Sequence, residues 1–484
     1  MSSVKKEMTK GVLWSAVGKY SGVITQLVIT AVLARLISPS EFGVVAIATV
    51  LIAFLNIFAD LGIGAAIIQR QDFGKHEYDA IFSFSVYLGL ILALAFFFAS
   101  YLVESFYASP DLRTICQVLS INLFIGSLNM VPNAIISKQK RFKFIAQRTL
   151  FFQFCGGICA ICAAYHGWGC YSLLVAPILS AVGCFVANYR QNPLSFYPIL
   201  DLRPVKSVFS YSSFLLVFNV MNYFTRNLDK LIIGRYFSLG ALGYYDKSYH
   251  LMMLPLHQIT HVITPVMHPV LASLQNNYHE MAENYAKIIK LLATISFPLG
   301  VFLYFAAQNM IVLVYGNQWL PSVPIFKILA FSVPVQMLIS TTGGIYQASG
   351  RTDWLFYAGL FHTTITVIGF VVAALLFNDI KAMAWSFVFT MNLHTFLTLY
   401  VIYGIIFKES YFQVVKILFS PLLNAVLLIF ILALVNKFLS FSPIVGVVFQ
   451  FAISILLSLM IIHLTHQYNV LAILHKVYTK INIH

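Results

Sequence analysis

The sequence contains few charged side chains. Only 10% of its 484 residues are Asp, Glu, Lys or Arg, whereas 60% are hydrophobic. A soluble domain usually has about 25% charged residues, so this composition excludes a water-exposed globule. The composition predicts an integral membrane protein, in which each span needs about 20 apolar residues.

Acidic residues are especially scarce. The chain has 16 Asp and Glu against 30 Lys and Arg, which gives a formal net charge of +14. In a soluble protein this excess would suggest a nucleic-acid partner. In a membrane protein it is typical of basic cytoplasmic loops that face anionic lipid. We therefore expect membrane lipids, and no nucleic acid, as partners.

Cysteine clusters with metal-binding or redox character are lacking. Of six cysteines, three share one face of a predicted helix: Cys155, Cys159 and Cys162. Gly156 and Gly157 lie beside them, without a nearby His or carboxylate, so we expect tight helix packing rather than a metal site. A nucleotide-binding loop is also lacking, so we expect no ATP hydrolysis and no cofactor.

Long apolar runs, in contrast, fill the chain. The first follows the basic stretch MSSVKKEMTK, is too long for a signal-peptide core and lacks an A-x-A-like cleavage site. Fourteen spans are predicted: 11–36, 43–69, 80–104, 114–136, 148–166, 170–189, 208–237, 243–274, 288–310, 324–348, 354–376, 383–407, 414–436 and 443–465. The connections are short and leave no room for a separate soluble domain.

The distribution of Lys and Arg predicts the orientation. With the N-terminus inside, the cytoplasmic segments include the basic stretch SKQKRFKFIAQR at 137–148. The external segments contain only Arg113, Lys381 and Lys437. This asymmetry predicts that both termini are cytoplasmic. The basic run could gather pyrophosphate lipids at the membrane surface, but an ordinary positive-inside loop explains it equally well.

Two stretches repeat at a constant offset of 200 residues. Residues 33–45, LARLISPSEFGVV, align with residues 233–245, IGRYFSLGALGYY. Each covers the end of one predicted span and the turn into the next, in the same orientation. A weaker repeat aligns KQKRFKF at 138–144 with ASGRTDW at 348–354. This pattern predicts parallel repeats about an axis along the membrane normal.

The repeat predicts an all-α polytopic membrane protein with two six-helix lobes. The expected lobes are residues 1–207 and 208–410, and residues 411–484 form an added helix pair and a cytoplasmic tail. Four positions of the repeated hairpins are candidates for a structural role: Arg35, Gly43, Arg235 and Gly243. The two arginines lie near the external ends of their spans, where a long cation reaches headgroups. We expect them to cap the hairpin or to close an outer gate.

Several stretches resemble a known family. The hairpin ARLISPSEFGVVAIATVLIAFLNIFADLGIGAAIIQR is similar to the opening hairpin of polysaccharide exporters in the multidrug, oligosaccharidyl-lipid and polysaccharide (MOP) flippase superfamily. LVYGNQWLPSVPIFKILAFSVP and YQASGRTDW are similar to later connections of these proteins. The branch that they resemble is that of the colanic-acid-exporter-like proteins.

The resemblance implies a fold and a cargo. The implied fold, shared with the MATE transporters, is a V of two lobes that opens alternately to either side of the bacterial inner membrane. The implied cargo is an oligosaccharide linked to a polyprenyl pyrophosphate, such as undecaprenyl pyrophosphate, moved from the cytoplasmic to the periplasmic leaflet. An ion gradient or the membrane potential would drive the transport. Polysaccharide polymerase and assembly proteins are possible partners.

A polar stripe lies on the seventh predicted span. Its members follow steps of three or four residues and share one helical face: Asn219, Asn222, Arg226, Asp229 and Lys230. A charge at mid-bilayer costs about 2.5–3.5 kcal/mol on insertion scales, so we expect the stripe to face a watery interior rather than lipid. The alternative is an interhelical ion-pair lock among Arg226, Asp229 and Lys230 that touches no cargo.

The first span has a related, milder stripe that includes Lys19 and Gln26. At the repeat offset Lys19 corresponds to Asn219, so the leading helix of each lobe would present a polar face to one cavity. A diphosphate-sugar headgroup suits such a cavity, because phosphates attract Lys and Arg while Asn and Gln bond to sugar hydroxyls. Asp60, in the second span, could pair with Lys19 or join a gate.

The eighth predicted span carries a stripe of titratable groups: Asp246, His250, His257, His261 and His268. These side chains could carry protons and couple export to a proton gradient. The alternative is helix packing through hydrogen bonds around proline kinks. A metal site is not expected, because His257 and His261 lack a matching third ligand.

Three rival functions remain open. A peptidoglycan-precursor flippase would share the pyrophosphate lipid. A drug/cation antiporter of the same superfamily would favour buried acids, whereas the deep charges here are mainly cations. A membrane-bound polysaccharide polymerase or glycosyltransferase would need catalytic groups in an external loop, where the candidates are few: Glu41, Asp111 and Asp379. We therefore expect a transporter and not an enzyme.

Overall fold

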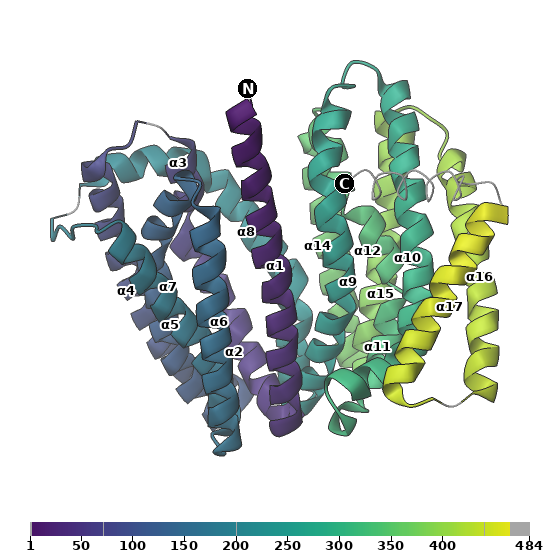
Figure 1. Ribbon diagram of the computed structural model, residues 1–484, viewed down its shortest axis with the longest axis horizontal. Coiled ribbons are helices and arrows are strands. Elements are labelled where there is room, and N and C mark those ends of the chain that lie inside the picture. Colours follow the sequence, from purple (N-terminus) through teal and green to yellow (C-terminus); the bar gives the residue numbers. More distant parts are fainter. Residues whose placement is uncertain (1, 71, 200, 440, 465–484) are drawn as a thin grey trace. The chain divides into compact units, whose positions relative to one another are not determined.

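The computed structural model describes residues 2–70, 72–199, 201–439 and 441–464, and every regular element within these ranges is a helix (Figure 1). The chain divides into two compact units, Met1–Gly243 and Tyr244–His484. The all-helical prediction is confirmed. The expected division at residues 207 and 410 stays a prediction about lobes, and the expected tail after residue 464 lies outside the described residues.

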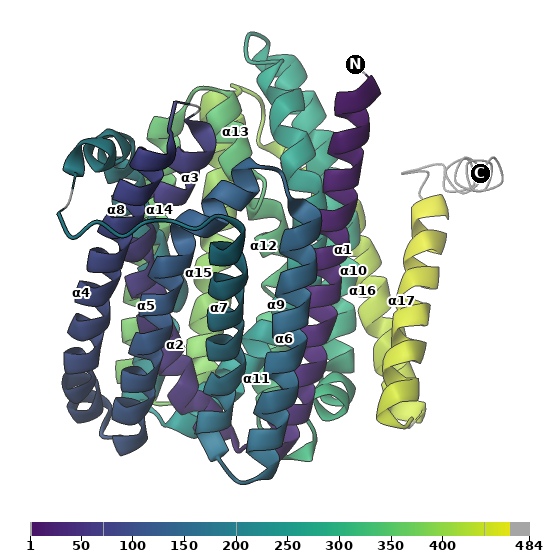
Figure 2. The same ribbon diagram turned by 60° about the vertical axis from the view of Figure 1, so that its left-hand side comes forward.

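The first unit consists of the helices up to α8 and the first turn of α9. Its elements are α1 (Ser2–Leu36), α2 (Pro39–Asp60), α3 (Ile63–Gln69), α4 (Lys75–Tyr107), α5 (Pro110–Lys138), α6 (Phe142–Tyr165), the 3₁₀ turn η1 (Gly169–Tyr171), α7 (Ser172–Gln191) and α8 (Leu202–Tyr236). Figure 2 shows α4, α5, α7, α6 and α1 side by side, and each packs on its neighbour. α8 packs against α2 and α4.

The second unit is built around the long helix α10. Its elements are α9 (Leu239–Ala272), α10 (Tyr278–Val314), η2 (Asn317–Trp319), α11 (Ser322–Ala330), α12 (Val333–Ile339), α13 (Thr342–Ala348), α14 (Thr352–Val372), η3 (Ala373–Phe377), α15 (Ile380–Tyr400), η4 (Val401–Ile406), α16 (Phe412–Phe438) and α17 (Pro443–Leu464). α10 packs against α11, α12, α16 and α17, and α14 packs against α15. η3 and η4 are π-helical continuations of α14 and α15.

The described chain has 11 helices that are long and apolar enough to cross a membrane, or 12 if a bent pair forms one span. The bent pair joins 322–330 to 333–348 at an angle of 48°. Each of the fourteen predicted segments falls on one helix or on two or three consecutive helices. α8 and α9 are not among the helices counted by composition, and the side chains of residues 204–218 in α8 and of most of residues 261–269 in α9 lie outside the described residues. Their passage through the membrane, and the total of fourteen, therefore stay predictions.

The second predicted span is interrupted near its end. Leu61 and Gly62 both have positive φ angles, of 42° and 75°, and these residues end α2 and begin α3. Glycine adopts such angles without steric cost, so the sequence LGIG favours a break here. Asp60 is the last residue of α2 and is exposed at this break.

The small residues beside the cysteines pack as expected in helix contacts. A Cβ atom on Gly156 would lie 3.0 Å from the Ala176 carbonyl oxygen of α7, and one on Gly157 would lie 2.1 Å from Ile29 of α1. These positions let α6 approach both neighbours closely. Cys159 and Cys162 are exposed on another face of α6.

Candidate functional site

The helix with the polar stripe begins at an exposed cap. Asp201 caps α8, where its Oδ1 accepts a hydrogen bond from the Arg203 backbone amide at 3.0 Å. The Arg203 guanidinium donates to both carboxylate oxygens of Asp201, and these bonds hold the pKa of Asp201 below its ordinary value. This cap fixes the start of the helix that carries Arg226.

Contacts with neighbouring helices set the rotation of α8. The Tyr223 hydroxyl donates to the backbone carbonyl of Val50 on α2. The Tyr107 hydroxyl of α4 donates to the Leu231 carbonyl at 3.3 Å. These two contacts turn one side of α8 toward α2 and α4. Arg226 lies on α8 one turn after Tyr223 and is exposed.

The residues of the predicted stripe on α8 differ in how far they are buried. Asn219, Asn222 and Arg226 are exposed. Asp229 is buried with 2% of its surface accessible, and its Oδ1 accepts a 2.8 Å hydrogen bond from the Lys230 amide. Lys230 is half-buried. The acid therefore points inward while Arg226 points outward.

The ion-pair lock finds no support at Arg226. In the part of the chain that the structure describes, no side chain forms an ion pair or hydrogen bond with Arg226. The choice between cargo contact and a lock for the whole stripe still stays a prediction.

The stripe on α1 extends onto α6 through an amide that the sequence reading missed. Lys19 and Gln26 are both exposed. Gln153 of α6 donates to the Gln26 side chain at 3.2 Å and to the Gly22 carbonyl at 3.0 Å. Gln153 is the one amide in the apolar run FFQFCGG, which is the signal that could have identified it. Lys19 and Asp60 form no ion pair with each other, although the structure describes both.

The two repeated hairpin turns have the same hydrogen bonds at an offset of 200 residues. Ser38 accepts from the Glu41 amide and Ser238 from the Ala241 amide, so each serine caps the helix that follows it. The Phe42 amide donates to the Ser38 carbonyl and the Leu242 amide to the Ser238 carbonyl.

The same hairpins cross each other at two glycines. A Cβ atom on Gly43 would lie 1.8 Å from the Leu239 carbonyl oxygen, and one on Gly243 would lie 2.0 Å from the Pro39 carbonyl oxygen. The contact is reciprocal, since each glycine faces the residue four positions before the other. All four residues belong to the first unit. We call this contact the glycine crossing.

The paired arginines of these hairpins lie on the surface. Arg35 and Arg235 are both exposed. The Arg235 guanidinium lies 5.1 Å over the ring of Phe106 on α4, which is a cation–π contact. Their role as caps or gate elements stays a prediction.

The titratable stripe on α9 is partly described. Asp246 forms a 3.4 Å ion pair with its neighbour Lys247. His250 and His257 are exposed. The side chains of His261 and His268 lie outside the described residues, so the single stripe of four histidines stays a prediction.

A buried cation lies inside the first unit. Arg148, expected in the basic cytoplasmic segment 137–148, lies in α6 and is only 8% exposed. Its Nη2 donates to Asn133 Oδ1 of α5 at 2.6 Å, and its Nη1 donates to the Cys184 carbonyl of α7 at 3.4 Å. Among the described residues no carboxylate pairs with it. Arg148 therefore ties three helices together through neutral acceptors, which a count of loop charges could not reveal.

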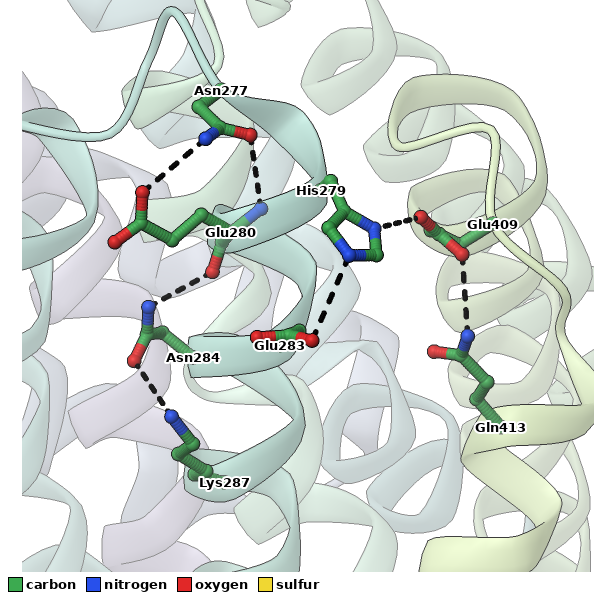
Figure 3. Close-up of polar contacts among 8 residues, drawn as sticks. All are labelled: Asn277, His279, Glu280, Glu283, Asn284, Lys287, Glu409 and Gln413. Atoms are coloured by element: carbon green, nitrogen blue, oxygen red, sulfur yellow. Dashed lines mark hydrogen bonds and ion pairs between the residues drawn. The ribbon is translucent and has the colours of Figure 1, made fainter.

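A polar network joins the start of α10 to the segment before α16 (Figure 3). His279 Nδ1 lies 2.6 Å from Glu409, and its Nε2 lies 3.6 Å from Glu283. Gln413 donates to the other oxygen of Glu409 at 3.2 Å. Asn277 caps α10 through the Glu280 amide. The network fastens the connection between α15 and the last two helices to α10.

The described residues contain no candidate metal site. No three His, Cys, Asp or Glu side chains there are grouped to hold an ion. The chemistry that the exposed stripes offer is instead the binding of anions and hydroxyl groups, by a guanidinium, two ammonium groups and several amides.

Comparison with known proteins identifies relatives by sequence. A family model described as "Polysaccharide biosynthesis protein" matches residues 32–324, more than half of the chain. The chain is 27% identical over 363 residues to the teichuronic acid biosynthesis protein TuaB of Bacillus subtilis (strain 168), and the match covers 74% of each chain. It is 25% identical over 423 residues to the lipopolysaccharide biosynthesis protein WzxC of Escherichia coli (strain K12), covering 87% of this chain and 85% of WzxC.

Solved structures with the same fold include two kinds of transporter. The lipid II flippase MurJ in an inward closed conformation matches with a TM-score of 0.73 and 15% identity, covering 94% of this chain and 99% of MurJ. A MATE multidrug resistance transporter of the MOP superfamily, in an inward-facing conformation, matches with a TM-score of 0.60 and 15% identity, covering 83% of this chain and 98% of that chain. At this identity the two likenesses show the fold alone.

Proposed function

Because this chain belongs to the polysaccharide biosynthesis protein family and is a polysaccharide exporter of the MOP flippase superfamily, we propose that it flips a lipid-linked oligosaccharide. The cargo is a polysaccharide repeat unit on a polyprenyl pyrophosphate, of which undecaprenyl pyrophosphate is the expected carrier. The protein moves it from the cytoplasmic to the periplasmic leaflet of the bacterial inner membrane by alternating access. An ion gradient or the membrane potential drives the cycle.

The observation that carries this proposal is the exposed cation Arg226 on α8. A charge in this position would cost about 2.5–3.5 kcal/mol against lipid at mid-bilayer, so the face of α8 that carries it belongs beside water or a polar headgroup. The buried position of Asp229 supports the same reading, because the acid is withdrawn from the exposed face. The face therefore presents net positive charge.

The exposed groups match the chemistry of a diphosphate-sugar headgroup. The Arg226 guanidinium can bind two phosphate oxygens at once, and Lys230 offers a compact second charge. Asn222 and Asn219, one and two turns away, can bond to sugar hydroxyls. Lys19 and Gln26 offer the same groups on α1. The polyprenyl tail remains in lipid.

Two transporter alternatives are weaker. A peptidoglycan-precursor flippase would use the same phosphate chemistry, but the likeness to MurJ is one of fold at 15% identity. The relatives of higher identity are named for teichuronic acid and lipopolysaccharide biosynthesis. A drug/cation antiporter would present an acid to its cargo, whereas Asp229 is buried.

Enzymatic activity is also the weaker interpretation, because the chain is a polysaccharide exporter by family and the solved structures with its fold are a flippase and a transporter. We also propose that both termini are cytoplasmic. The basic segment 137–143 lies at the cytoplasmic surface, and polysaccharide polymerase and assembly proteins receive the exported unit.

Reconstitution into liposomes tests the proposal. The purified protein is supplied in parallel vesicles with an undecaprenyl-pyrophosphate oligosaccharide, with lipid II or with a cationic dye. We expect the oligosaccharide to appear in the opposite leaflet, as detected by an impermeant glycosidase. Transport of lipid II alone would favour a peptidoglycan-precursor flippase, and transport of the dye alone would favour a drug/cation antiporter. Transfer of the sugar to an acceptor would favour an enzyme.

A further inference from the structure

Two helices of the second unit each contain a single ionisable side chain of the Asp, Glu, Lys, Arg or His type within a long apolar run. In residues 354–378 that side chain is His362, and in residues 382–407 it is His394. Ionisable groups inside apolar spans are costly to insert and mark functional sites by default. Neither histidine belongs to the stripes that the sequence pattern predicts.

These two histidines meet between α14 and α15. Their rings are stacked, with centroids 4.3 Å apart and planes inclined by 21°. His394 is only 9% exposed, and its Nδ1 lies 3.4 Å from the Thr398 hydroxyl. His394 lies at the middle of the helical stretch Ile380–Ile406, about 20 Å from either end at 1.5 Å per residue. The pair therefore lies near the centre of a span.

We propose that His362 and His394 together form a binding site for a single proton. Two imidazolium rings at this separation would repel each other strongly inside an apolar span. One imidazolium stacked on a neutral ring is instead stabilised by the electrons of that ring. The pair therefore alternates between a neutral state and a state with one positive charge. Histidine is suited to this exchange because it titrates near neutral pH.

Titratable groups on the elements packed against α14 and α15 are few. Those on the helices themselves and on α11, α13 and η4 are Asp353, Tyr357, Lys381, Tyr400, Lys327, Tyr346 and Tyr403. The Lys327 ammonium lies 5.4 Å over the ring of Tyr304. Asp353 forms a 2.8 Å ion pair with Arg351.

α9 also touches α15, through the rings of Tyr249 and Phe387 at 5.5 Å. The carboxylate of α9 in this region, Asp246, forms an ion pair with Lys247, and His250 is exposed. Asp246 and Asp353 thus each have a cation beside them. We expect the access of water to influence how readily the histidine pair takes up its proton.

Burial disfavours the charged state, so the packed arrangement of α14 and α15 holds the pair neutral. An arrangement that admits water favours the protonated pair. Proton uptake is thereby linked to a change in the packing of the second unit. The inference deepens the proposed function, on which its transport consequence rests, by assigning the driving ion to α14 and α15 instead of α9. The binding of the proton itself does not depend on the cargo.

A transition metal is a poorer occupant of the pair. The nitrogen lone pairs of imidazole lie in the plane of the ring, so two stacked rings do not aim them at a common point between the rings. Tetrahedral sites also need a third and a fourth ligand. The described residues contain no group of three metal-binding side chains.

Proton binding is tested on the full chain in nanodiscs without cargo. Histidine side chains are labelled with ¹⁵N and followed by NMR between pH 5 and pH 8.5, and the signals are assigned with His362→Asn and His394→Asn. We expect one proton to be taken up by the pair, with each substitution shifting the titration of the remaining ring. Independent titration of both rings to the doubly charged state, or no protonation of either, would overturn the proposal.

Coupling is tested in proteoliposomes that contain the lipid-linked oligosaccharide. We expect the flux to change by about fivefold when the pH on one side is moved from 8 to 6, and His394→Asn to remove this dependence. His166→Asn, which alters an exposed histidine at the end of α6, is the control and should keep it. Full pH dependence in His394→Asn and in His362→Asn would end the coupling assignment. Absence of all flux in the unmodified protein would count against the proposed function, and the NMR titration would still decide the proton site.

Discussion

Arg148 donates a 2.6 Å hydrogen bond to the side-chain oxygen of Asn133, from α6 to α5, within the apolar interior of the first unit. Among the residues that the structure describes, no acid neutralises this guanidinium. A buried ion held by neutral acceptors depends strongly on each of them, because losing one leaves part of the charge unsolvated.

Replacing the acceptor tests this dependence. We expect Asn133→Leu to destabilise the protein by about 1.5–3 kcal/mol, the usual value for a hydrogen bond to a charged group. The measurement is the melting temperature of the purified protein in detergent. Removing both partners, with Arg148→Met and Asn133→Leu together, should recover much of the loss. Additive losses in the double variant would mean that the two residues do not act as a unit.

The glycine crossing makes a second prediction. A methyl group on Gly43 or Gly243 would collide with a backbone carbonyl, so the helices must move apart. We expect Gly43→Ala and Gly243→Ala each to cost about 1–3 kcal/mol, as overpacking usually does, and to lower the yield of folded protein. Gly240→Ala is the matched control in the same turn, because the nearest atom lies 4.0 Å from its Cβ position.

The losses of stability caused by Gly43→Ala and by Gly243→Ala should not add. Once one methyl group has separated the helices, the second meets less resistance, so the double variant should melt close to the worse single variant. If Gly43→Ala, Gly243→Ala and Gly240→Ala all melted at the same temperature as the unmodified protein, the two backbones would not be in contact as described.

The exposed cation on α8 makes a third prediction, for transport. We expect Arg226→Ala to reduce oligosaccharide flux by about tenfold or more, corresponding to the loss of a charge-assisted contact, at unchanged abundance. Arg226→Lys should restore part of the flux, since it keeps the charge but not the two-pronged geometry. The control is Arg203→Ala, at the exposed start of the same helix. Equal flux from Arg226→Ala and the unmodified protein would remove the headgroup role.

The network of Figure 3 makes a fourth prediction. His279→Ala breaks the contact between α10 and Glu409, which holds the connection that leads into α16. We expect faster trypsin cleavage after Lys408, followed by mass spectrometry. Asn284→Ala, also on α10 but bonded to Glu280 and Lys287 instead of Glu409, should leave the cleavage rate unchanged. An unaltered rate in His279→Ala would show that the network does not restrain this segment.

Local sequence patterns predicted the helices well because apolar runs of span length have few alternatives to a helix in lipid. They could not settle how many helices cross the membrane. α8 and α9, which carry the polar stripes, are not among the 11 helices that qualify by composition, and part of each lies outside the described residues. The break at Leu61 shows another limit, since it was not predicted although the glycines of LGIG favour it.

The candidate site was predictable where it depended on periodicity within one helix. Steps of three and four residues identified the face of α8 on which Arg226 is exposed. Contacts between helices were beyond such patterns. The bond from Arg148 to Asn133 and the meeting of His362 with His394 join residues that no spacing rule connects. Asp229 shares a helical face with Arg226 by spacing, yet packing against neighbours buries one and not the other.

The glycine crossing also has a mechanical consequence. Interlocked side chains resist the rotation of one helix against another, because each side chain must leave the gap between its neighbours. At Gly43 and Gly243 no side chains interlock, and the two backbones contact each other directly. A rotation of the first turn of α9 on α2 would therefore displace no side chain at these two positions.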